Sequence, residues 1–117
     1  MAKKKQETTL EGKALDDLVD QCFVVADRKG RIVEKNSSPV LSYLSMKYQS
    51  DYGEISFKVT RSAMGNGSYR IEVKDCGKVL LKAYGNYTSG PYNNMAEKYV
   101  PGGDWQKKLK KEYEEVI

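Results

Sequence analysis

The sequence predicts an α+β domain: a four- to five-stranded antiparallel meander sheet with an N-terminal and a C-terminal amphipathic helix packed on one face. Three observations predict this class. Apolar and polar residues alternate through three consecutive segments between residues 55 and 84, which is the period of a half-buried strand. Short turn signals that contain glycine separate these segments, as in hairpins. Two segments with apolar residues at three–four spacing flank the meander.

The first predicted helix follows a short basic tail. Residues 1–7 are polar and basic, so we expect them to be disordered, and we assign residues 8–117 to a single domain. Thr8–Glu11 matches a capping box, the reciprocal pairing of side chains and backbone donors that opens many helices. The apolar stripe that follows consists of Leu15, Leu18, Val19, Cys22 and Val25.

The segment 22–35 is compatible with two structures. In the first, which we favour, the helix continues to about Ala26 and a loop leads to a short strand at 31–35. In the second, residues 22–26 pair with residues 31–35 as a hairpin, because β-branched and aromatic residues precede a turn signal. The periodicity alone leaves both open.

The remaining strands follow from the alternation of apolar and polar residues. We predict strands over about 42–49, 55–60, 69–74 and 79–84, with 95–100 as an edge strand. The first of these segments would also suit a helix. Odd-numbered residues of the meander, such as Phe57 and Ile71, should be buried, while even-numbered residues such as Lys58 and Leu80 should face solvent. Cys76-Gly77 is typical of a two-residue hairpin turn in which glycine supplies a positive φ.

The last predicted helix should depend on packing rather than on local electrostatics. Asp104 suits the N-cap position, and Trp105 and Leu109 begin an apolar stripe. Lysines near the start of this helix and glutamates near its end both oppose the helix dipole. We therefore expect Trp105 and Leu109 to hold the helix on the body of the protein.

The composition argues against catalysis and against a membrane protein. The 117 residues contain no histidine, which removes His-based nucleophile activation and His-based metal sites. The two cysteines, Cys22 and Cys76, lie too far apart in sequence for a Cys-x-x-Cys site. No apolar run reaches the roughly 20 residues of a membrane span, and no secretion signal is recognisable. We expect a cytoplasmic, non-enzymatic protein without cofactor or metal, and its oligomeric state stays open.

Basic residues at solvent-facing positions of the predicted sheet indicate one candidate binding surface. The net charge is +4, and the excess lies mainly in residues 37–103, which carry 8 basic and 5 acidic groups. Cations interleaved with aromatic rings, here Tyr43 and Tyr84, are typical of platforms for single-stranded nucleic acid. The alternative is that charged side chains, among them Glu72, only keep the face soluble. The candidate nucleic-acid-binding residues are Lys47, Lys58, Arg70, Lys74 and Lys82.

Tyrosines around the longest irregular stretch indicate a second candidate surface. The chain has nine tyrosines against two phenylalanines and one tryptophan. Tyrosine combines a large contact area with a hydroxyl group, so it is common at protein interfaces. We predict a protein-binding module that uses this loop and the sheet edge, although tyrosines can also pack loops without a partner. The candidate partner-binding residues are Tyr84, Tyr87, Tyr92 and Tyr99.

Two resemblances extend these expectations. Phe23–Asn36 resembles the opening hairpin of PAS sensor domains, which would imply a sensor of a small ligand but identifies no site residue. Fewer residues separate Asn36 from Ile55 than the helices of that family need. Over a longer stretch, the leading helix and the strand–turn–strand that ends in Tyr84–Tyr87 resemble small bacterial domains of unknown function. That resemblance implies no activity.

Overall fold

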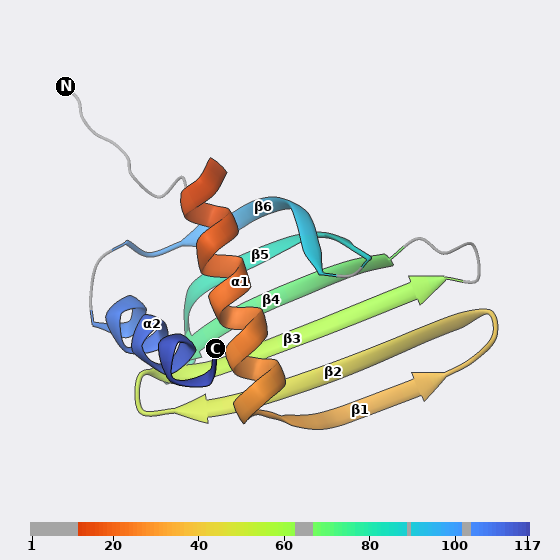
Figure 1. Ribbon diagram of the computed structural model, residues 1–117, viewed down its shortest axis with the longest axis horizontal. Coiled ribbons are helices and arrows are strands. Elements are labelled where there is room, and N and C mark those ends of the chain that lie inside the picture. The colour runs from red at the N-terminus through yellow and green to blue at the C-terminus, as the bar shows by residue number, and fades with distance from the viewer. Residues whose placement is uncertain (1–11, 63–66, 89, 102–103) are drawn as a thin grey trace.

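The computed structural model describes residues 12–62, 67–88, 90–101 and 104–117. Within these residues, six antiparallel strands form one sheet in chain order, with two helices on one side of it (Figure 1). The α+β class and the meander order are confirmed, while the expected four to five strands become six. The elements are α1 (Gly12–Lys29), β1 (Arg31–Ser37), β2 (Leu41–Ser50), β3 (Gly53–Ser62), β4 (Gly67–Asp75), β5 (Lys78–Tyr87), β6 (Pro91–Tyr99) and α2 (Trp105–Val116). The predicted tail and capping box fall outside the described residues.

Helix α1 is longer than expected. It continues past Ala26 to Lys29, so residues 22–26 are helical and the alternative hairpin does not form. Cys22, Val25 and Ala26 are fully buried, and this packing overrides the strand preference of the segment. The similarity to the PAS hairpin therefore has no structural counterpart at these residues.

Gly30 allows the chain to pass directly from α1 into the sheet. Its N–H donates to the carbonyl of Ala26 at 3.0 Å and so closes the helix. A Cβ atom at this position would lie 2.4 Å from that carbonyl oxygen and 2.6 Å from the carbonyl oxygen of Lys47 on β2. Only glycine leaves room for this approach, so β1 begins one residue after the helix.

The strand β1 explains the difference in strand number. It extends the short strand expected at 31–35 and pairs with β2, with a register shift between Ile32 and Glu34. All seven of its residues are exposed, because the strand lies at the sheet edge and beyond α1. An exposed edge strand needs no alternation of apolar and polar residues, so the sequence pattern is weak there.

The alternation predicted for the meander holds in β3 and β4 and fails at one point in β5. Phe57 and Ile71 are buried and Lys58 is exposed, as expected. Leu80, expected to face solvent, is buried because the register between β4 and β5 shifts beside Val73. The bulge inserts one residue and brings two consecutive leucines inward.

The two helices differ in how they contact the sheet. Helix α1 crosses the inner face and packs against β2, β3, β4 and β6 (Figure 1). Helix α2 packs mainly against α1, which corrects the expectation that both helices lie directly on the sheet. Trp105 and Leu109 are buried, as predicted. Asp104 makes no side-chain cap; its backbone carbonyl accepts from the N–H of Lys108 instead.

Candidate functional site

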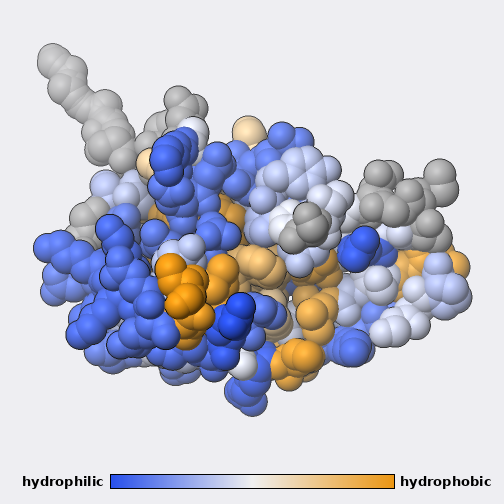
Figure 2. All heavy atoms as spheres, viewed as in Figure 1, coloured by the Kyte–Doolittle hydropathy of each residue, from blue (hydrophilic) through white to orange (hydrophobic). Residues whose placement is uncertain are grey.

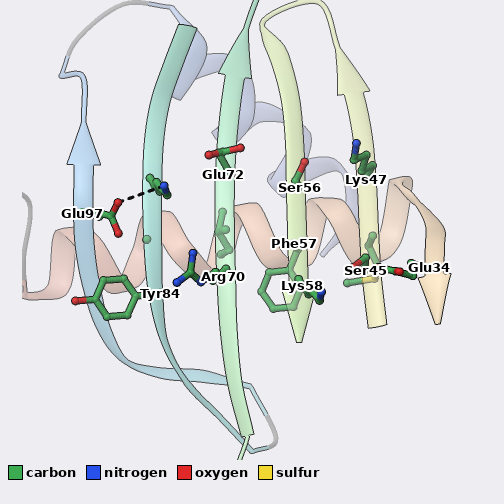
Figure 3. A pocket seen from close by; sticks show the side chains of 14 residues that line it. Glu34, Ser45, Lys47, Ser56, Phe57, Lys58, Arg70, Glu72, Tyr84 and Glu97 are labelled. Carbon is green, nitrogen blue, oxygen red and sulfur yellow. Dashed lines mark ion pairs between the residues drawn. The ribbon is translucent and has the colours of Figure 1, made fainter. Parts of the chain in front are cut away.

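The outer face of the sheet, opposite the helices, arranges polar side chains in rows across the strands. Side chains that are direct partners in an antiparallel sheet point to the same face. The central row runs from β2 to β5 through Ser45, Lys58, Arg70 and Tyr84. The adjacent row is formed by Lys47, Ser56, Glu72 and Lys82. Together they line a shallow hollow of about 390 Å³ (Figure 3).

Lys58 and Arg70 are the central pair of this hollow. They are direct partners on β3 and β4, both are exposed, and neither forms an ion pair with any residue that the structure describes. Like charges placed directly opposite each other destabilise a sheet. Lys58 gains partial compensation because its Nζ lies 4.8 Å from the centroid of the Tyr43 ring. The pair therefore leaves an uncompensated positive charge at the centre of the face.

Carboxylates accompany the outer cations. Lys47 lies 3.8 Å from Glu54, and Lys82 lies 3.3 Å from Glu97, the pair that Figure 3 marks with a dashed line. Lys74 lies 3.2 Å from Glu72. Of the predicted cations, Lys47, Lys58, Arg70 and Lys82 line the hollow, whereas Lys74 lies outside its lining. Positive charge is therefore concentrated at the centre of the face and balanced at its periphery.

Tyr84 adds an open aromatic ring beside these cations. It is the direct partner of Arg70, and its side chain is 41% exposed. Figure 3 shows the Tyr84 ring nearly face-on beside Arg70, so one face of the ring is turned toward solvent. A planar group of a ligand can stack on such a ring while the neighbouring guanidinium holds an anion.

The four candidate tyrosines do not share one surface. Tyr84 lies on the outer face, while the Tyr87 ring packs near the Phe57 ring on the inner side, at 6.2 Å between centroids. The Tyr99 hydroxyl accepts a hydrogen bond from Gln106 of α2 at 2.8 Å. Tyr92 is exposed on β6, at the opposite edge of the sheet from β1. A role for these residues in partner binding stays a prediction.

A polar cluster around Glu112 was not predicted from the sequence. The Glu112 carboxylate accepts hydrogen bonds from Tyr48 and from Ser50, the latter at 3.4 Å, and pairs with Lys29 at 3.1 Å. Burial raises the pKa of this carboxyl, but the hydrogen bond from Tyr48 and the charge of Lys29 outweigh burial, so its pKa is lowered. The cluster joins α2 to α1 and β2, which is a structural role.

The thiols have contrasting surroundings. Cys22 is fully buried in α1, and burial raises the pKa of its thiol to about 12. Cys76 is exposed at the tip of the β4–β5 hairpin, where φ is 51° and Gly77 follows with φ 85°. Both are free. In the described ranges, no group of three or more histidine, cysteine, aspartate or glutamate residues could hold a metal ion.

Neither helix in the described part of the chain is long and apolar enough to cross a membrane. Comparison of the chain with protein-family models, curated proteins and solved structures finds no match.

Proposed function

We propose that this protein is a non-enzymatic binding module that holds a single-stranded nucleic acid on the outer face of its sheet. The observation that supports this most directly is the pair Lys58 and Arg70, adjacent and unneutralised, beside the open ring of Tyr84. A phosphate placed between the two cations would relieve their mutual repulsion. A base stacked on Tyr84 would place its own phosphate within reach of Arg70.

The shape of the face favours a single strand over a duplex. From Tyr43 on β2 to Tyr84 on β5 the face spans three strand spacings, about 14 Å. Bases of a single strand expose their flat surfaces to rings at such positions, whereas a duplex buries them in its own stack. Peripheral ion pairs such as Lys82–Glu97 limit the number of free cations, so we expect the salt dependence of binding to come mainly from Lys58 and Arg70.

The test is a salt titration of affinity. Fluorescence anisotropy with labelled 20-nucleotide oligo(dT) and oligo(U) would give the dissociation constant at several salt concentrations. We expect the logarithm of affinity to fall linearly with the logarithm of salt concentration. The double variant Lys58→Gln/Arg70→Gln should reduce the magnitude of that slope by about 1.4, roughly 0.7 for each lost contact to a single strand. Tyr84→Leu should weaken binding by about 1–3 kcal/mol with the slope unchanged, because it removes stacking and no charge.

The control is Lys110→Gln, which removes one positive charge at an exposed position of α2, away from the sheet face. It should leave affinity and slope within experimental scatter of the unaltered protein. Equal affinities of the double variant and the control would contradict the proposal, as would the absence of binding at low salt.

A second candidate is a protein partner at the β6 edge, as the sequence analysis predicted for the sheet edge. Met95 of β6 is 55% exposed, is the direct partner of Tyr84, and lies in the same strand as exposed Tyr92. A free edge strand with exposed apolar side chains is a template for strand addition. Met95→Glu should abolish co-purification of such a partner from the native host, while Lys110→Gln should retain it. Retention of the partner by both variants would exclude this edge.

A further inference from the structure

Helix α1 leaves part of the inner face of the sheet uncovered. Beyond the helix, toward β1 and β2, lies a groove of about 310 Å³ between α1 and the first three strands. Figure 2, which views this side, shows hydrophobic atoms gathered beside α1 over this part of the sheet. Its volume is at the lower end of the range of small-molecule sites, about 300–1,000 Å³.

An aromatic cluster forms the wall of the groove nearest α1. The rings of Phe23 and Phe57 lie 4.9 Å apart, and the Tyr87 ring is 5.8 Å from Phe23. Leu44 and Val59, direct partners on β2 and β3, continue the apolar lining away from the cluster. Phe57 and Val59 are buried residues of the core, so this wall is a fixed part of the fold.

Two cations line the groove together with these apolar residues. Lys35 is the direct partner of Leu44, and Arg61 follows Val59 by two residues in β3, so both belong to the inner face. Both are exposed, and neither has an ion-pair partner among the described residues. The single acid of the described lining is Asp27 of α1, so the groove is net positive.

We propose that this groove binds an anionic amphiphile, a carboxylate that carries an aliphatic chain. The chain lies along Leu44 and Val59 against the aromatic wall, and the carboxylate is held by Arg61 and Lys35. Arg61 offers a planar fork of donors that matches a carboxylate, and the apolar wall removes the chain from water. The two cations match the carboxylate of the ligand, and the apolar lining matches its chain. This site is independent of the outer face, which lies across the sheet.

The experiment titrates the full-length protein with sodium decanoate below its micelle concentration and follows the methyl signals of Leu44 and Val59 by NMR. We expect saturable binding of one decanoate per chain. The variant Lys35→Gln/Arg61→Gln should weaken it by about tenfold or more, because two charge-assisted contacts are lost. Decyltrimethylammonium, with the same chain and the opposite charge, should also bind at least about tenfold more weakly than decanoate.

The matched control is Lys58→Gln/Arg70→Gln, which removes two charges from the outer face and should leave decanoate affinity within about twofold. Three results would overturn the proposal: no saturable shift, equal affinities of the two double variants, or equal affinities of the two amphiphiles. Sedimentation could also contradict the proposal. If the protein sedimented as a dimer and Leu44→Gln dissociated it, a second copy of the chain would occupy the groove instead of the amphiphile.

Discussion

Glu112 shows how a single side chain can reverse an expectation based on local sequence. Within α2, a glutamate this far along the helix opposes the dipole. In the folded protein it binds Tyr48, 64 residues away, and Lys29, 83 residues away. These partners belong to other elements, so no local pattern could reveal them. The residue holds α2 in place together with the buried Trp105 and Leu109.

We expect the Glu112 cluster to make stability depend on pH in the acid range. Because the folded-state pKa of Glu112 lies below its ordinary value of 4.5, its contribution is fully present above that value and is lost as pH falls through the lowered folded pKa. Urea melts at about pH 6, 5, 4 and 3 would measure the free energy of unfolding above and below the ordinary pKa of the carboxyl.

The matched variant is Glu112→Gln, which retains hydrogen bonding but cannot ionise. Its free energy of unfolding should fall less than that of the unaltered protein over the same acid range. Parallel curves for the two proteins would mean that Glu112 gains nothing from its charge in the folded state.

At the scale of elements, the close approach of β6 to β5 depends on one glycine. A Cβ atom on Gly85 would lie 2.8 Å from the Tyr69 ring and 2.8 Å from the carbonyl oxygen of Asn93. Gly85→Ala should therefore destabilise the protein by about 1–3 kcal/mol, because backbone and ring must both shift. Urea denaturation would measure this cost.

Gly90 offers the control for that substitution. A Cβ atom there would meet nothing within 4 Å, and Gly90→Ala should be neutral or stabilise the protein by up to about 1 kcal/mol. If Gly85→Ala proved as stable as Gly90→Ala, the two strands could not approach as closely as described.

Elements that bury one face could be predicted from the sequence, because burial makes apolar residues recur at the spacing of a strand or a helix. Exposed elements carry no such repeat and were predicted less well. The alternation in β3 and β4 and the stripe of α1 face the core, and both were found. The full length of β1 was not found because its exposed side chains follow no period. The bulge that buries Leu80 was missed because a single inserted residue changes the faces without changing the composition.

At the scale of the whole molecule, the sheet separates two surfaces of different chemistry. Four of the five predicted basic residues, all except Lys74, line the hollow of the outer face, since the period of two assigns them to one side of each strand. Only the register shows that Lys58 and Arg70 are neighbours and that Tyr84 adjoins them. The inner groove was not predicted, because it exists only where α1 stops covering the strands.

The order of the strands has a consequence for synthesis on the ribosome. Every strand pairs with its neighbour in the chain, so each new hairpin can add to an edge that is already made. Helix α1 emerges first, yet it packs against β6 and α2, which emerge last. The apolar surface of α1 that β6 and α2 cover therefore stays exposed until the C-terminal quarter of the chain has been made, and a chaperone could bind it during that interval.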